Sequence, residues 1–273
     1  MSYDGAPFCG WQIQPGSPSV QEALQDALGT LLRCPIGVVG AGRTDTGVHA
    51  LRYVAHFDFD GEVPPPLAGD PIDCNQLRYK LNAILPKSIS ISSITPVSPD
   101  FHARFGAVRR SYSYFLHRCK DPFLEGRSYY YAYPDVDFDA MNRAAQALLG
   151  TRDFSCFEKS GGDNKTSVCT VFAAAWTPYV PSHAADGRSE SAITSVMPGA
   201  TGHLYWRFDI SADRFLRNMV RAIVGTLLEV GRGKRTVEEF NALVLGSGAS
   251  GATRSDAGES VPGHALYLTD VKY

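Results

Sequence analysis

The 273-residue chain lacks the features that mark secreted, membrane and zinc-binding proteins. Its six cysteines are scattered, with no CxxC pair and no zinc-like spacing, so we expect free thiols. No apolar run approaches the ~20 residues that span a bilayer, and no signal-peptide pattern opens the chain. These absences predict a cytoplasmic protein.

An excess of charge of one sign is also missing, because 26 basic residues accompany 28 acidic residues. A nucleic-acid partner must therefore be argued from local clusters of basic residues. The chain shows no P-loop, no dinucleotide-binding fingerprint and no cluster of metal ligands. We therefore expect no cofactor and no metal. An apolar content of 44% is enough for one large domain or two of ordinary size.

Apolar periodicity and turn residues predict alternating helices and strands. In the first half, the predicted helices are 19–31 and 73–85, and the predicted strands are 36–39, 53–59, 88–97 and 109–117. In the second half, the predicted helices are 137–149, 215–230 and 236–245, and the predicted strands are 166–176, 204–210 and 264–271. Residues 178–200, rich in Pro, Ser, Ala and Gly, are expected to form a flexible insertion.

The order of these elements has the β-α-β-β-α-β character of the split βαβ motif. We predict an α+β fold in which two ferredoxin-like, RRM-like halves share a mixed, mostly antiparallel sheet with helices on one side. The predicted N-terminal half is 1–118 and carries the candidate catalytic carboxylate, and the C-terminal half is 119–273. Capping boxes are predicted at Ser19 with Glu22 and at Thr236 with Glu239.

The most specific stretch is 42–50, Gly-Arg-Thr-Asp-Thr-Gly-Val-His-Ala, which lies between two apolar runs. It places one carboxylate, Asp45, in a tight turn. Gly42 and Gly47 allow backbone angles that other residues resist. Arg43 and Thr44 are placed to pair with the carboxylate and keep it charged. This arrangement is suited to holding one reactive group rigidly in the open.

A turn of this composition is also compatible with a purely structural role, with an aspartic protease and with a hydrolase. Asp and Gly are ordinary turn residues, and most such turns carry no chemistry. Asp45-Thr46-Gly47 is the tripeptide of aspartic proteases, but those enzymes need two carboxylates and the chain has one Asp-Thr-Gly. A hydrolase would need an acid–base partner for Asp45. His49 is the nearest candidate, and it fits better as a brace for the turn.

Two further segments combine basic and apolar residues. Residues 101–115 interleave arginines with aromatic rings, which suits phosphate binding and base stacking, although an edge strand with a solvated basic face has the same pattern. Arg214, Arg217 and Arg221 recur at helical spacing. Arg221 has apolar neighbours and so needs an anionic partner, which a structural ion pair would also supply.

Together these segments resemble the TruA-type tRNA pseudouridine synthases. The motifs occur in the family's order and extend over nearly the whole chain. They are Tyr3-Asp4-Gly5, Gly10-Trp11-Gln12, the 42–49 turn, 101–105, Tyr112-x-Tyr114, Asn164-Lys165-Thr166, 215–225 and 254–268.

The resemblance implies a cofactor-independent isomerase that converts uridine to pseudouridine in the anticodon stem-loop of tRNA, acting as a homodimer. Asp45 matches the family's nucleophile, Tyr112 the active-site tyrosine, and Arg221 the basic residue that pairs with the carboxylate. Attack at C1′, attack at C6 and elimination through a glycal are all compatible with these residues.

The resemblance also implies substrate-binding residues. Arg43 matches the arginine that fills the gap left by a flipped base, and Leu266 is an apolar wall for that base. The other predicted substrate-binding residues are Thr44, His49, Arg104, Arg110, Lys165 and Arg214. The competing class is a non-catalytic, RRM-like RNA-binding module. The Asp45 turn argues against it, because a carboxylate near phosphates repels them.

Overall fold

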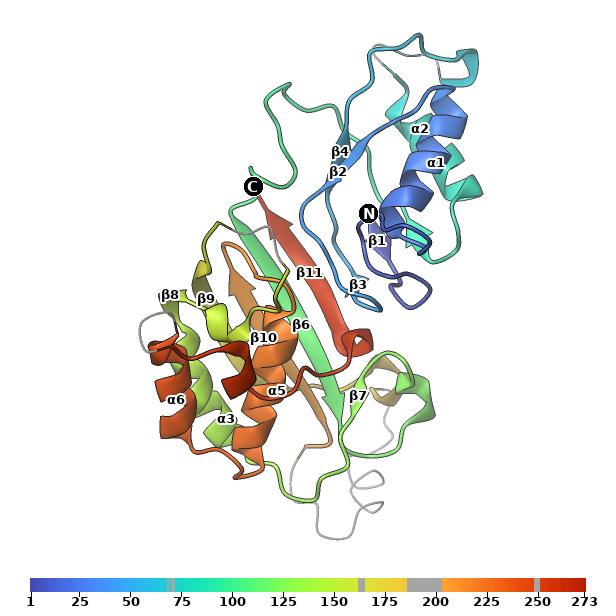
Figure 1. Ribbon diagram of the computed structural model, residues 1–273. Helices are drawn as coiled ribbons and strands as arrows, with labels where there is room; N and C mark the ends of the chain where they lie inside the picture. Colours follow the sequence, from blue (N-terminus) through green and yellow to red (C-terminus); the bar gives the residue numbers. More distant parts are fainter. Residues whose placement is uncertain (68, 70–71, 162–164, 186–202, 248–250) are drawn as a thin grey trace. The chain divides into compact units, whose positions relative to one another are not determined.

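The computed structural model describes residues 1–67, 69, 72–161, 165–185, 203–247 and 251–273. The chain forms two compact units (Figure 1). The first unit contains Met1–Val108 and Tyr267–Tyr273, and the second contains Arg109–Leu266. Most of the expected 178–200 insertion lies outside the described residues.

The first unit is built on short strands in the order β5-β1-β3-β11. Strand β1 is antiparallel to β5 and β3, while β11 runs parallel to β3. A separate antiparallel ribbon joins β2 to β4. The strand bounds are β1 Ser2–Tyr3, β2 Val38–Gly40, β3 His49–Ala50, β4 Ala55–Phe57, β5 Ile89–Ser90 and β11 Leu266–Lys272.

Helices α1 (Val20–Leu32) and α2 (Cys74–Ile84) pack against each other in this unit. Each begins at a side-chain cap. Ser19 accepts the Glu22 N–H, which is one half of the predicted capping box, and Asp73 accepts N–H groups of the first turn of α2. Each buries an apolar stripe.

The second unit is an antiparallel sheet in the order β6-β10-β9-β8, with β7 parallel to β6. The bounds are β6 Arg109–His117, β7 Tyr129–Tyr130, β8 Gly150–Asp153, β9 Val168–Pro178 and β10 Tyr205–Ala212. Helices α3 (Phe138–Ala145), α5 (Met219–Gly231) and α6 (Val237–Gly246) pack together on one face of this sheet (Figure 1). Helix α5 is almost entirely buried, so it forms the centre of this unit's core.

The α+β class with mostly antiparallel pairing is confirmed, and so are strand 109–117 and the capping box at Thr236. The six cysteines are free, as expected. That two ferredoxin-like halves share one sheet remains a prediction, as does the functional division at residue 118. Strand β6 belongs to the second compact unit, because it pairs along its length with β10.

Three predicted boundaries are wrong. The strand expected at 88–97 is only Ile89–Ser90, because β5 pairs with just the two residues of β1. The helix expected at 137–149 ends at Ala145 and continues as a 3₁₀ turn. The helix expected at 215–230 begins at Met219, because Asn218 adopts a left-handed conformation with φ of 65°. None of the helices in the described parts of the chain has the length and apolar character to cross a membrane.

Candidate active site

The predicted tight turn at Asp45 is present. The Asp45 carbonyl accepts the Val48 N–H at 3.1 Å, and Gly47 has φ of 76°. A positive φ at the third position defines a type II turn and favours glycine there. Strand β3 begins immediately afterwards at His49, so one end of the turn is tied into the sheet.

The segment before Asp45 is held by residues near the N-terminus. The Thr44 carbonyl accepts the Trp11 N–H at 3.3 Å, and the Thr44 hydroxyl lies 2.9 Å from the Tyr3 hydroxyl. The Tyr53 hydroxyl donates to the Gly42 carbonyl. Tyr53 is itself fixed by stacking on Trp11, with ring centroids 4.2 Å apart. The backbone leading to Asp45 is therefore held on both sides.

Two glycines of the N-terminal motifs make this close approach possible. A Cβ atom on Gly5 would lie 2.0 Å from the Val48 carbonyl oxygen, and one on Gly10 would lie 2.2 Å from the Thr44 carbonyl oxygen. Real Cβ atoms do not come this close to backbone. The glycines of the Tyr3-Asp4-Gly5 and Gly10-Trp11 motifs therefore let these segments pack directly against the backbone on either side of Asp45.

His49 is the first residue of β3 after the turn and is buried, with 1% of its surface exposed. Its Nδ1 atom lies 3.1 Å from the Gly5 nitrogen and 3.0 Å from a carboxylate oxygen of Asp4. Its ring stacks on Tyr267 of β11 at 4.5 Å. These contacts make His49 a brace that joins β1, β3 and β11. Within the turn, Asp45 and Thr44 are half-buried, whereas Arg43 is exposed.

Tyr112 and Arg221 lie in the second unit. Tyr112 is a half-buried residue of β6, where it pairs with Ile210. Its ring meets the ring of Phe215 edge-on, with centroids 5.1 Å apart and planes at 89°. An edge-on partner fixes the plane of the tyrosine ring while leaving the rest of the side chain half-exposed.

Arg221 lies in the first turn of α5. Its Nε donates to the Val261 carbonyl at 2.7 Å, and the Val261 N–H donates to the Arg221 carbonyl at 3.3 Å. One turn further along α5, a Cβ atom on Gly225 would lie 1.8 Å from the Glu259 carbonyl oxygen. Residues 259–261 therefore pack directly against α5, and the Val261 carbonyl fixes the Nε end of the Arg221 guanidinium.

Arg254 anchors residues 258–260. The sequence alone assigns Arg254 no role. Its guanidinium donates to the Gly258 carbonyl at 2.9 Å and to the Ser260 hydroxyl at 2.8 Å. The Gly258 N–H donates to Thr226 of α5 at 2.9 Å. The one signal in the sequence was the presence of Arg254 in a motif of the resemblance.

The other predicted substrate-binding residues differ in accessibility. Arg104 and Lys165 are exposed, Arg110 and Arg214 are half-buried, and Leu266 is 5% exposed. Arg110 donates to the Asp213 carbonyl at 2.7 Å. Arg217 lies inside the predicted helix 215–230 but precedes the start of α5, as does Arg214, so the helical spacing of the three arginines does not place them on one helix.

Arg118 lies in the basic stretch after 101 but is not a surface residue. It is 4% exposed, and its Nη2 donates to the carbonyls of Tyr133, at 3.0 Å, and Pro134. Its Nε has no hydrogen-bond partner among the described residues. Burial lowers the pKa of this guanidinium, opposed by the nearby Asp135. Arg118 is therefore a structural residue that joins β6 to the 133–134 segment.

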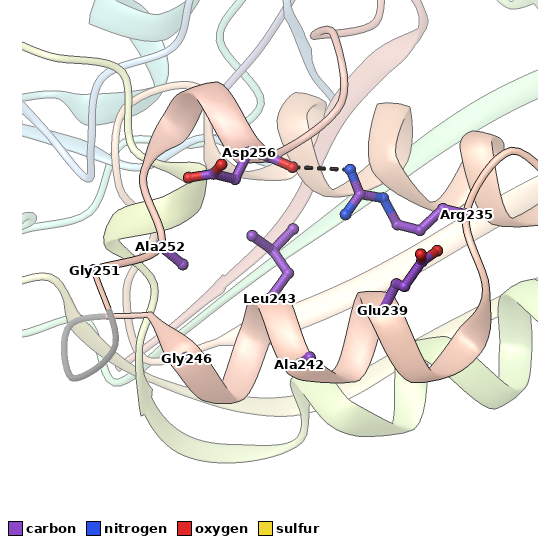
Figure 2. A pocket seen from close by; sticks show the side chains of 8 residues that line it. All are labelled: Arg235, Glu239, Ala242, Leu243, Gly246, Gly251, Ala252 and Asp256. Atoms are coloured by element: carbon purple, nitrogen blue, oxygen red, sulfur yellow. Dashed lines mark hydrogen bonds between the residues drawn. The ribbon is translucent and has the colours of Figure 1, made fainter.

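A hollow lies elsewhere in the second unit. It has a volume of about 510 Å³ and lies between α6 and the 251–256 loop (Figure 2). Arg235 at its rim donates to the Asp256 carbonyl at 2.8 Å and to Glu229 at 3.2 Å. None of the candidate catalytic residues lines this hollow. The described part of the chain also contains no group of three His, Cys, Asp or Glu side chains that could hold a metal.

Comparison with known proteins identifies the family of the chain. The sequence profile of a family described as tRNA pseudouridine synthase matches residues 144–273. Proteins named tRNA pseudouridine synthase A from Bacteroides fragilis and Porphyromonas gingivalis are 44% and 43% identical, over all of this chain and 94% and 95% of their own lengths. One of the same name from Bacillus licheniformis is 36% identical over all of this chain and 97% of its own. The chain therefore belongs to the tRNA pseudouridine synthase family.

Proposed function

We propose that this protein converts uridine to pseudouridine in the anticodon stem-loop of tRNA, in the cytoplasm. The observation that carries the proposal is the Asp45 turn, which presents one carboxylate on a backbone held by Tyr3, Trp11 and Tyr53. Full-length identity of 44% to a protein named tRNA pseudouridine synthase A supports the choice of reaction.

The reaction breaks the bond between ribose C1′ and uracil N1 and forms a bond between C1′ and C5. C5 loses a proton and N1 gains one, so the atoms balance and no electron is gained or lost. The transformation therefore needs no redox cofactor. It needs a group that stabilises the separated sugar and base, and a group that moves the C5 proton.

We assign the first task to Asp45 as the nucleophile. Aspartate carboxylates form covalent intermediates with sugar carbons in other enzymes, which is the chemistry assigned here. Arg221 is assigned to keep it charged, on the basis of the family resemblance and of the way Val261 holds the arginine stem. Tyr112 is assigned to stack on the uracil and exchange the proton at C5.

The proposal also assigns residues to substrate binding. The exposed Arg43 fills the space left when the target base leaves the stem, and Leu266 forms an apolar wall. Arg104 and Lys165 are exposed and suited to phosphate, and the half-buried Arg110 and Arg214 are assigned to substrate binding with them. Thr44 and His49 hold the backbone around Asp45. The exposed basic side chains would supply binding energy despite the formal net charge of −2.

The test is to incubate an unmodified tRNA transcript with the purified protein, adding no cofactor, and to map pseudouridine. Wild-type protein forms it in the anticodon stem-loop. Asp45→Asn abolishes the reaction and retains tRNA binding, because the carboxylate repels phosphate and contributes nothing to affinity. A variant that keeps a tenth of the single-turnover rate loses only about 1.4 kcal/mol of barrier stabilisation, and Asp45 would not be the nucleophile.

The competing RRM-like binding module predicts a different result in the same assay. Such a protein binds the transcript and forms no pseudouridine, in the wild type as in Asp45→Asn. Specific binding without product would therefore replace the enzymatic proposal by the binding one.

The proposal includes a homodimer that grips one tRNA with both subunits. Light scattering at micromolar concentration should give about twice the monomer mass of 29.6 kDa. A monomer mass in both the absence and the presence of tRNA would remove the dimer from the proposal without affecting the chemistry.

A further inference from the structure

The turn at 101–106 in the first unit is rigid and ends in an exposed aromatic ring. The Nδ1 atom of His102 accepts the N–H groups of Arg104 and Phe105, both at 3.1 Å. The His102 carbonyl accepts the Gly106 N–H at 2.8 Å. Three backbone donors of the turn are thus satisfied by one histidine, so the turn has a defined shape before anything binds.

The base of this turn is tied to two other parts of the first unit. The Tyr273 hydroxyl donates to the Ala103 carbonyl at 2.7 Å, and the Ala103 N–H donates to Nδ1 of His56 at 3.1 Å. The Val108 N–H donates to the Lys272 carbonyl at 2.8 Å. Contacts with the C-terminal residues 272–273 and with His56 of β4 therefore fix the base of the turn.

A chain of rings leads outward through the turn to Phe105. His56 lies 6.1 Å from Phe101 and 5.0 Å from His102, measured between ring centroids. His102 lies 4.4 Å from Phe105, with the two planes tilted by only 30°. Phe105 is the outermost ring and is 78% exposed, the highest value among the large apolar side chains described.

A basic side chain lies beside the Phe105 ring. The Arg104 guanidinium lies 5.7 Å from the centre of the Phe105 ring. The sequence from 101 to 120 contains no Asp or Glu. A flat aromatic face beside arginine, on a rigid turn without acidic residues, is the combination that binds nucleobases by stacking and phosphates by charge.

We propose that Phe105 is a stacking platform for an unpaired nucleobase of the tRNA substrate, with Arg104 neutralising an adjacent phosphate. The inference rests on the proposed function and adds a positioning residue to it. Stacking needs no particular base, since every base has a π face. Phe105 therefore contributes affinity and orientation of the tRNA, and Asp45 carries the chemistry.

The test compares Phe105→Ala, Phe105→Leu and Phe105→Trp with Phe123→Ala in the full-length protein. Phe123 is 74% exposed and lies in the second unit against His183, so it is a matched surface aromatic. The probe is the unmodified tRNA transcript. Phe105→Ala and Phe105→Leu should weaken binding and raise KM by about 10- to 100-fold, the usual effect of removing one base–aromatic stack. Phe105→Trp should bind as the wild type, and so should Phe123→Ala.

Salt dependence separates stacking from charge. The slope of log K against log salt should be the same for Phe105→Ala and the wild type, because no counterion release is lost. In Arg104→Gln the slope should become shallower by about one unit. A shallower slope in Phe105→Ala would mean that the substitution disturbs phosphate contacts and that the stacking inference is wrong.

A direct readout of stacking is Trp fluorescence of Phe105→Trp combined with Asp45→Asn, which cannot turn over. Two of the native tryptophans, Trp11 and Trp176, are 3% and 2% exposed, and the Asp45→Asn protein supplies the background signal. The new emission should be quenched on addition of tRNA. No quenching at saturating tRNA, together with wild-type affinity of Phe105→Ala, would overturn the inference.

Two further outcomes separate the platform from a protein contact and from the proposed function. If Phe105→Ala changes the mass by light scattering and leaves tRNA affinity unchanged, the ring packs against a second copy of the chain and the platform is wrong. If the wild type itself forms no pseudouridine, the proposed function fails, yet quenching by tRNA would still support the platform. The two proposals therefore fail separately.

Discussion

Gly10 lies against the carbonyl of Thr44 so closely that a Cβ atom on residue 10 would be 2.2 Å from the carbonyl oxygen. The neighbouring Trp11 N–H donates to the same carbonyl. The backbone one residue before Asp45 is therefore set by a residue near the N-terminus. We therefore expect the position of Asp45 to depend on this contact.

Gly10→Ala should lower both stability and turnover, whereas Gly16→Ala should lower stability alone. Both glycines have positive φ, 99° and 70°, but a Cβ atom on Gly16 would meet nothing within 4 Å. The backbone strain costs about 1–2 kcal/mol in each case, and the clash at Gly10 adds about 1–3 kcal/mol. Denaturant unfolding and single-turnover assays measure the two effects. Equal losses of activity in the two variants would show that the contact does not position Asp45.

Arg254→Met should reduce stability and activity through the segment that lies on α5. The guanidinium makes charge-assisted hydrogen bonds to the Gly258 carbonyl and the Ser260 hydroxyl, and their loss should cost about 2–4 kcal/mol. Because Val261 holds Arg221, a loosened segment should also lower kcat. Arg217→Met is the stability control, since its side chain is exposed and donates to one carbonyl at 3.3 Å. A stable Arg254→Met protein with wild-type kcat would contradict this account.

Arg118→Met should change stability and Lys120→Met should change the salt dependence of tRNA binding, although the two residues are nearly adjacent. Arg118 is buried and bound to carbonyls, so its loss should lower the free energy of unfolding by about 1–3 kcal/mol. Its loss should leave the salt dependence of tRNA binding unchanged. Lys120 is exposed, and its loss should make the slope shallower by about 0.9 while leaving stability within ~0.5 kcal/mol. Thermal melts and binding at several salt concentrations distinguish the two roles.

Stability should fall as the pH decreases below about 6.5, in part because of His117. Burial lowers the pKa of this residue in the folded protein, opposed by Asp121 and Glu125. Its Nδ1 lies 3.0 Å from the Ser128 hydroxyl. With a lowered folded pKa, the unfolded chain takes up the proton first, so the free energy of unfolding decreases as the pH falls through the unfolded value.

His117→Asn should remove this contribution, so its stability should depend less on pH between about 7 and 5.5 than that of the wild type. The difference in slope is at most about 1.4 kcal/mol per pH unit. Denaturant unfolding at several pH values measures it. Parallel curves for the two proteins would show that His117 titrates alike in both states.

Local sequence determined the features that depend on neighbouring residues. A side chain that can cap an N–H three residues later marks the starts of α1, α2 and α6, and the alternation at 109–117 marks β6. The Asp45 turn follows from Gly47, which needs no long-range partner to adopt a positive φ. Caps, turns and alternation act over four residues or fewer, so they can be predicted from a single sequence.

Tertiary structure decided the features that depend on distant residues. The start of α5 is set at Asn218, whose side chain donates to Ser260, 42 residues away. The burial of Arg118 depends on the carbonyls at 133–134, and the clash that excludes any residue but glycine at position 10 comes from Thr44. No local pattern contains these partners. Whether a basic residue contacts carbonyls or solvent, and which glycines are indispensable, is decided by packing between segments far apart in the chain.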